Sequence, residues 1–188
     1  MKNVVIACRV LAFMTLLTGL VYPLFITGLG QAVFADAAGG SLIIRDGHII
    51  GSYWIAQKFT QDKYFWPRPS SIDFNPLPSG GSNLSPASTQ LKTQVDQRAA
   101  ALQSGNGTAA IPQDLLFTSA SGLDPHITPA AALYQAGRVA QARALPIAQV
   151  NGLIRRLVED RQLGLLGEKR VNVLELNLAL DRLGHEAP

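Results

Sequence analysis

An uncharged apolar run near the N-terminus constrains this chain more than any other feature. After Lys2 and Arg9, no charged residue occurs until Asp36. As an α-helix rising ~1.5 Å per residue, Val10 to Ala35 would reach ~39 Å, which exceeds the ~30 Å hydrocarbon core of a bilayer. We therefore expect one retained membrane-spanning helix. Gly19, Gly28 and Gly30 would let another helix approach closely.

The run also divides the chain. Residues 1–35 are predicted to form a cytoplasmic tail and the span, and residues 36–188 a single soluble domain. Because Lys2 and Arg9 make the N-terminal flank positive, this flank should stay in the cytoplasm, which places the domain in the periplasm. A cleaved secretory signal is the alternative, since Ala35-Asp36-Ala37 has a small-x-small form, but the run is much longer than the ~7–15 residues of a signal core.

Composition excludes several classes of function. One cysteine among 188 residues allows neither a disulfide framework nor a multi-cysteine zinc site, and three scattered histidines make a histidine-built metal centre improbable. The net charge of +3 comes without a basic stripe, so nucleic acid is not an expected partner. The sequence contains neither a phosphate-binding P-loop motif nor a Gly-x-Ser-x-Gly nucleophile motif. We expect no catalytic machinery, metal or cofactor belonging to this chain itself.

The soluble domain is predicted to have an α+β fold. Asp46-Gly47 separates two β-rich runs, which indicates a hairpin, and the proline-rich residues 60–88 predict a long ordered loop. Thr128-Pro129 is typical of a helix start, and Asn172 with Glu175 three residues later resembles a capping box. Strands early and helices late favour α+β. The predicted helices are a segment from Pro86 or Ser88 to Ser104–Gly107, residues 129–143, residues 146–157 with Ile147, Val150, Ile154 and Leu157 inward, and a last helix after Asn172.

Three groups of residues are candidates for binding. The segment Ser79-Gly80-Gly81-Ser82-Asn83 could present several backbone N–H groups to an anion, or could simply be a tight turn. Ser121, Gly122 and Asp124 lie in a second small-residue segment that reads equally as a scaffold loop. Gln135 and Arg138 fall on one helix face, where they could bind phosphate or carboxylate, or could tie down neighbouring loops.

The ordered set of these segments resembles the C subunit of the bacterial potassium-transporting P-type ATPase, the Kdp system, over nearly the whole chain. Ala120 departs from the family pattern, where glycine is usual, and Ser85 departs in the same way. The matching pieces are the N-terminal span, Gly51-Ser52, Gln57-Lys58-Phe59, Tyr64-Phe65-Trp66-Pro67-Arg68-Pro69-Ser70, Ser79-Gly80-Gly81-Ser82-Asn83-Leu84, Ser121-Gly122-Leu123-Asp124-Pro125-His126-Ile127, Gln135 with Arg138-Val139-Ala140, and Val171-Asn172-Val173-Leu174-Glu175-Leu176-Asn177.

The resemblance implies an accessory, non-catalytic subunit of an ATP-driven potassium importer in the bacterial inner membrane. It implies three partners: a channel-like potassium-translocating subunit, an ATP-hydrolysing P-type subunit and a small single-span subunit. The family is described as raising the ATP affinity of the hydrolysing subunit, with ATP reached through the complex. On that view Ser79–Asn83 looks like the signature loop of ABC transporters, and Gln135 and Arg138 would lie near nucleotide.

A periplasmic domain conflicts with a nucleotide-contacting role, because ATP is scarce there. Our hypothesis is that the placement is right and that the chain acts structurally, docking on the channel-like subunit near its ion entrance. Two alternatives stay open. One is direct nucleotide binding through Gln135 and Arg138, and the other is a stand-alone, signal-anchored extracytoplasmic hydrolase or ligand-binding protein.

Overall fold

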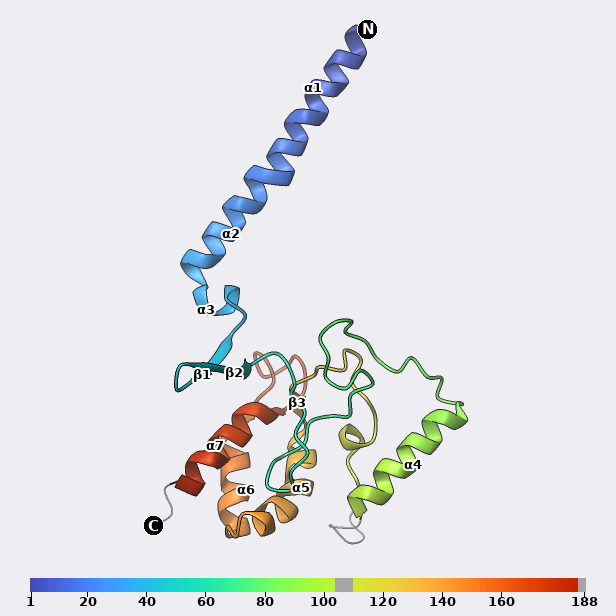
Figure 1. Cartoon of the computed structure of the whole chain (residues 1–188), viewed down its shortest axis with the longest axis vertical. Coiled ribbons are helices and arrows are strands. Elements are labelled where there is room, and N and C mark those ends of the chain that lie inside the picture. The colour runs from blue at the N-terminus through green and yellow to red at the C-terminus, as the bar shows by residue number, and fades with distance from the viewer. Residues whose placement is uncertain (104–109, 186–188) are drawn as a thin grey trace. The chain divides into compact units, whose positions relative to one another are not determined.

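The computed structural model describes residues 1–103 and 110–185, and the chain divides into two units, Met1–Ile50 and Gly51–Pro188. Figure 1 shows the order of the elements along the chain. The first unit contains α1 (Lys2–Leu16), a π-helical turn (Leu17–Val21), α2 (Tyr22–Val33), α3 (Ala35–Ala38), β1 (Leu42–Arg45) and most of β2 (His48–Ser52). The second contains α4 (Thr89–Gln103), a 3-10 turn (Gln113–Leu115), β3 (His126–Ile127), α5 (Pro129–Ala142), α6 (Ile147–Arg156), β4 (Val158–Glu159), β5 (Arg170–Asn172) and α7 (Val173–His185).

The N-terminal helix runs without interruption from Lys2 to Val33, and its most apolar 18-residue stretch has a mean hydropathy of 2.3 and no buried residue. It is therefore long and apolar enough to cross a membrane, as predicted. Its π-helical turn ends one residue before Tyr22-Pro23. Because proline has no N–H to donate, the helix locally loosens its hydrogen-bond pattern here instead of breaking.

The predicted hairpin is present after the helix. β1 and β2 pair, and the two residues between them, Asp46 and Gly47, have φ values of +51° and +76°. Consecutive left-handed residues define the turn that best matches the twist of paired strands, which is why Asp-Gly is typical there. The first unit includes the hairpin up to Ile50, whereas the division predicted from the sequence at residue 35 follows the end of the apolar run.

The second unit contains a small antiparallel sheet in the order β3-β5-β4, and its register positions the candidate site. Ile127 and Val158 both pair with Val171, and these three apolar residues turn toward the core. Because side chains alternate along a strand, the flanking residues form the opposite, polar face. These are His126, which pairs with Asn172, and Glu159, which pairs with Arg170.

Two helix starts agree with their predicted capping residues. The Ala131 N–H donates to Thr128 Oγ1 at 3.2 Å, and the Glu175 N–H donates to Asn172 Oδ1 at 3.1 Å. Such side-chain acceptors satisfy N–H groups that the first helical turn leaves free. The N-terminus of α4 follows Ser88, as one of the two predicted starts had it, while its predicted end at residues 104–107 lies outside the described residues.

The core lies between α5, α6, α7 and the apolar face of the sheet. Alanines on α5 let α6 pack closely against it, and Val150 and Ile154 of α6 point inward as predicted. Ile147 was wrongly predicted to be inward: its side chain is 48% exposed, because it occupies the first helical position, and Leu153 is buried instead. The buried residues of this core are Phe65, Leu115, Ile127, Ala131, Ala132, Ala136, Val139, Ala140, Val150, Leu153, Ile154, Val171, Val173, Leu176 and Leu180.

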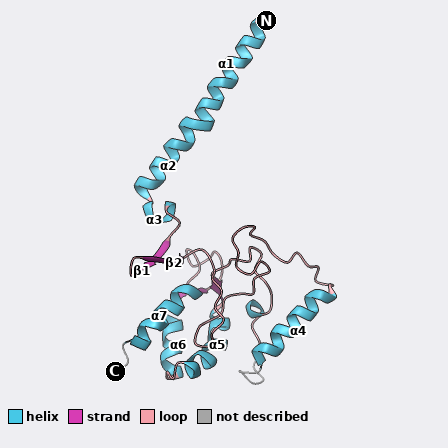
Figure 2. Ribbon diagram, viewed as in Figure 1, coloured by secondary structure: helices cyan, strands magenta, loops and turns pink. Residues whose placement is uncertain are grey.

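Long irregular connections complete the second unit, and Figure 2 shows them as loops. The predicted loop at residues 60–88 is confirmed, since no helix or strand interrupts it. One residue of this loop, Phe65, is completely buried in the core. Burial of loop backbone requires hydrogen-bond partners from elsewhere in the domain. These partners come from helix side chains that include two of the sequence candidates.

Candidate functional site

A short stretch of the long loop, residues 62–66, is held to the helices through its backbone; we call it the clamped segment. Asn177 of α7 forms two hydrogen bonds with Phe65: its Oδ1 accepts from the Phe65 N–H at 2.8 Å and its Nδ2 donates to the Phe65 carbonyl at 3.0 Å. Gln135 of α5 does the same for Trp66, at 2.8 and 3.1 Å. Each amide thus replaces the two bonds that a neighbouring strand would supply.

Two arginines complete the clamp. Arg138 donates to the carbonyls of Asp62 at 2.6 Å and Tyr64 at 3.1 Å, and its guanidinium lies 3.7 Å from the centre of the Trp66 ring. Burial lowers the pKa of Arg138 to about 10, against the opposing effect of Asp62, so the group stays cationic at neutral pH. Arg143 donates to the Lys63 carbonyl at 2.6 Å.

The structure therefore gives the candidates Gln135 and Arg138 a shared position. They lie on one face of α5, as predicted, and Arg138 donates to Gln135 Oε1 at 2.9 Å. Gln135 is fully buried and both ends of its amide are bonded to Trp66. These hydrogen bonds favour the interpretation of Gln135 and Arg138 as loop anchors. Nucleotide binding by the two residues stays a prediction, and it would need the same polar groups that now bond the loop.

The other two candidate segments pack against each other. The Gly80 N–H donates to the Ser121 carbonyl at 3.0 Å, and Ser79 Oγ donates to the same oxygen at 2.9 Å. A Cβ at Gly81 would lie 3.0 Å from the carbonyl oxygen of Ala120, so the backbone approaches too closely for a larger residue. Gly122 has φ +70° and a Cβ there would meet Ile72 at 2.5 Å. We call residues 79–83 and 119–122 the paired loops.

The remaining members of these segments also have local partners. The Thr118 hydroxyl donates to Ser82 Oγ at 3.5 Å, and the Ser121 hydroxyl accepts from the Leu123 N–H at 3.1 Å. Asn83 adopts a left-handed backbone with φ +51°. Since the Gly80 N–H is already donated within the chain, it is not free for an anion. The anion-nest hypothesis for Ser79–Asn83 stays a prediction without a contact that favours it.

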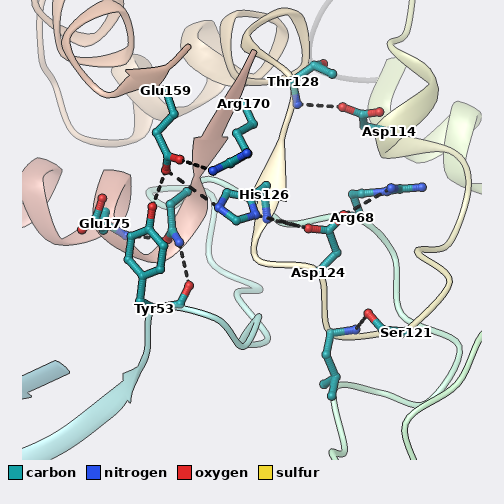
Figure 3. Close-up of polar contacts among 12 residues, drawn as sticks. Tyr53, Arg68, Asp114, Ser121, Asp124, His126, Thr128, Glu159, Arg170 and Glu175 are labelled. Atoms are coloured by element: carbon teal, nitrogen blue, oxygen red, sulfur yellow. Dashed lines mark hydrogen bonds and ion pairs between the residues drawn. The ribbon is translucent and has the colours of Figure 1, made fainter. Parts of the chain in front are cut away.

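Asp124 leads from the paired loops into a charged cluster, shown in Figure 3. Its carboxylate accepts from the backbone N–H of His126 at 3.0 Å and forms an ion pair with Arg68 at 3.3 Å. Burial alone would raise the pKa of Asp124, but hydrogen bonds from His126 and the charge of Arg68 outweigh it, so the net pKa is lowered. The carboxylate is therefore held ionised.

On its other side His126 faces a second carboxylate. Its Nε2 lies 3.8 Å from Glu159 Oε1, and its Nδ1 lies 3.6 Å from Asp124 Oδ1. Glu159 also pairs with Arg170 at 2.7 Å and accepts a hydrogen bond from the Tyr53 hydroxyl. Burial and this contact with Glu159 raise the pKa of Tyr53, so the phenol stays protonated as a donor. Burial likewise raises the pKa of the nearby Glu175, and the charge of Glu159 adds to the effect.

A cleft of about 240 Å³ opens beside this charged cluster. Three nitrogens of the cluster are buried without a hydrogen-bond partner within the described chain: Nε of Arg68, Nε2 of His126 and Nε of Arg170. Its lining contains three acids, three Lys or Arg residues and His126, so the formal charges nearly balance and the cleft suits polar or dipolar contacts better than a multiply charged anion. The lining residues are Arg68, Asp114, Asp124, His126, Ile127, Thr128, Glu168, Lys169 and Arg170.

Sequence reasoning found only one member of the charged cluster, Asp124. The Asp124-Pro125-His126 spacing was a usable signal, because an aspartate two residues before a histidine can accept from its backbone N–H. Glu159 and Arg170 could not be found in this way. Their pairing depends on the register of strands two and three residues long, which carry no readable alternation.

The fold and site together define a class of protein: a chain with one membrane-spanning helix and a small α+β domain whose loops are tied to its helices. A family model described as "K+-transporting ATPase, c chain" matches residues 4–182. Curated relatives called "Potassium-transporting ATPase KdpC subunit" include one from Polaromonas naphthalenivorans (strain CJ2), 51% identical over 97% of this chain and 96% of its own length. Another, from Methylococcus capsulatus (strain ATCC 33009 / NCIMB 11132 / Bath), is 48% identical over 94% and 96%. The chain belongs to the KdpC family.

We expect Gln135→Ala to lower the free energy of unfolding by about 2–4 kcal/mol. The change leaves the N–H and carbonyl of Trp66 without partners and opens a cavity in the core. Urea unfolding of the full chain in detergent measures this through tryptophan fluorescence, since both tryptophans, Trp54 and Trp66, lie in the second unit.

Gln141→Ala is the matched control, because Gln141 lies on the exposed face of the same helix; its effect should stay within about 0.5 kcal/mol. Equal stability of the two variants would contradict the clamp. If Gln135→Ala kept full stability but lost binding of a labelled ATP analogue, the nucleotide hypothesis would replace it.

Proposed function

We propose that this chain is an accessory, non-catalytic subunit of a high-affinity, ATP-driven potassium import complex in the bacterial inner membrane. The observation that carries the proposal is the family match over residues 4–182, at about the length of the curated relatives. The contacts of the candidate site are consistent with a non-catalytic role, because its polar side chains hold loops in place and pair with opposite charges. Such an arrangement builds a rigid surface rather than a reaction centre.

The N-terminal helix supports assembly with other spans. Its apolar surface is exposed along the whole length from Lys2 to Val33. Gly19, Gly28 and Gly30 have open space where a Cβ would stand, so a partner helix can approach the backbone there. The partners we propose are the channel-like potassium-translocating subunit, the ATP-hydrolysing P-type subunit and the small single-span subunit.

We further propose that the α+β domain lies in the periplasm and docks on the channel-like subunit near its ion entrance. Lys2 and Arg9 support this orientation, because basic flanks are retained in the cytoplasm. In this proposal the domain helps the complex to assemble and stabilises it. An increase in the ATP affinity of the hydrolysing subunit would follow indirectly, through partner subunits, and ATP would need no pocket on this chain.

A reporter fused after Pro188 tests the placement. A reporter that is active only outside the cytoplasm should be active, and a reporter active only inside should be silent, because the single span carries the C-terminus across. As a control, replacing the two basic residues by Lys2→Glu and Arg9→Glu should weaken the preference for a cytoplasmic N-terminus. A silent outer reporter with an active inner one would overturn the periplasmic placement.

Deletion of the chain tests the subunit role. Cells that depend on this pump should fail to grow at limiting potassium, and a plasmid copy of the chain should restore growth. In mild detergent, the tagged chain should elute with large multi-span proteins. Normal growth without the chain would contradict the proposal. Elution as a lone monomer that turns over a substrate would favour the stand-alone hydrolase instead.

A further inference from the structure

The hairpin that follows the membrane helix has one face made entirely of exposed apolar side chains. Leu42 and Ile44 are two positions apart on β1, so their side chains lie on the same face. The two-residue turn between the strands sets Ile44 opposite Ile49, which places Ile49 on that face as well. The three side chains are 48%, 63% and 64% exposed. We call them the hairpin face.

The polarity of the hairpin is the reverse of what water on this face would favour. Its opposite face carries the polar side chains, Arg45 and His48, together with Ile43 and Ile50, which are half-buried. In an antiparallel pair with one face in water, the polar residues face the solvent and the apolar residues are covered. Here the apolar face is the exposed one, which indicates contact with an apolar environment.

The length of the N-terminal helix brings the chain to the surface of the bilayer. With 32 residues, the helix is ~48 Å long. This is about the full thickness of a bilayer, which is ~40–45 Å when the headgroups are included. A helix that begins at one surface therefore ends, at Val33, at the level of the headgroups on the other side.

The connection from the helix to the hairpin is short and folded. The end of α3 has a Schellman motif: the Ser41 N–H donates to the Asp36 carbonyl at 2.8 Å, and the Gly40 N–H donates to the Ala37 carbonyl at 3.1 Å. Gly40 is the left-handed residue of the motif, with φ +88°. Residues 34–41 are thus a compact tether, and the hairpin follows α3 directly (Figure 1). The hairpin face therefore starts a few folded residues from the point where the helix leaves the bilayer.

A lipid surface fits the hairpin face better than a protein partner does. Three side chains are far fewer than the ~20–30 residues that each side of a specific protein interface contributes. Contact with lipid has no such requirement here, because the tether already keeps the face at a high effective concentration beside the bilayer and little further freedom is lost on contact. Segments that lie on bilayers bury their apolar side chains ~5–10 Å into the boundary between headgroups and acyl chains.

We propose that the hairpin face lies on the bilayer beside the exit of the membrane helix, with Leu42, Ile44 and Ile49 at the boundary between headgroups and acyl chains. Arg45 and His48, on the opposite face, are then directed away from the acyl chains. The contact holds the segment that leads into the α+β domain against the membrane. The inference needs the membrane span, but neither the role as a subunit nor the orientation of the span.

Quenching of a fluorescent label by lipid tests this contact. The full-length chain, with Cys8→Ser to remove its one cysteine, is placed in vesicles of phosphatidylethanolamine and phosphatidylglycerol that contain a lipid with a nitroxide on its acyl chain near the headgroup. A bimane label on Ile49→Cys should be quenched about twofold or more strongly than one on His48→Cys, because the two positions lie on opposite faces. His48 is the matched control, since it is the adjacent residue of the same strand and is also exposed.

Three outcomes would overturn the inference. The first is equal quenching at positions 48 and 49. The second is quenching at position 49 that is no stronger than at Leu163→Cys, an exposed position of the second unit. The third is protection of position 49 from aqueous iodide without quenching by the lipid nitroxide, which would assign the face to a protein. A label on Leu24→Cys in the helix must also be quenched, and its failure would remove the span on which the inference depends.

Ile44→Glu supplies a second test that does not depend on comparing two labelled faces. A carboxylate on the hairpin face is costly to bury among acyl chains, so quenching at position 49 should fall to the level seen at position 48. Undiminished quenching would show that the label itself enters the bilayer, and would overturn the inference. Unchanged unfolding measured by tryptophan fluorescence shows that the α+β domain is folded in each variant, since Trp54 and Trp66 lie in the second unit.

Discussion

One buried residue of a long loop, Phe65, enters the interior of the α+β domain beside its half-buried neighbours Tyr64 and Trp66. The other features of the domain depend on how the hydrogen bonds of this loop segment are satisfied. Buried N–H and C=O groups without partners are costly, and residues 62–66 lie outside the described helices and strands. Gln135 and Asn177 bond both polar groups of Trp66 and Phe65, while Arg138 and Arg143 cover the carbonyls before them. Side chains of α5 and α7 thus supply the backbone hydrogen bonds that a neighbouring strand would otherwise make.

This clamp positions the rest of the surface. Beyond Trp66 the chain reaches Arg68, which pairs with Asp124 and so connects the clamped segment to the charged cluster. Asp124 in turn follows the paired loops, in which Gly81 and Gly122 allow close backbone contact. Loops that would otherwise move are joined into one surface. For a chain of the KdpC family, a surface of fixed shape is suited to the binding of other subunits that we propose.

Much of the architecture could be predicted from the sequence because its signals are local. The span follows from a long uncharged run, the hairpin from Asp46-Gly47, and the helix starts from Thr128 and Asn172. The three-stranded sheet could not be predicted, because its strands are too short to show alternation. The site was predictable only in part: spacing placed Gln135 and Arg138 on one face, but their partners lie about 70 residues away in the chain, where no local pattern reaches.

Amide hydrogen exchange at Phe65 and Trp66 tests the clamp most directly. Loop amides normally exchange quickly, but these two donate to buried side-chain oxygens. They should exchange within about tenfold of the rate at buried Val139 of α5, because all three should open only when the core opens. Exchange at the rate of Leu163, an exposed residue between β4 and β5, would show that the segment is not held by the helices and would contradict this account of the domain.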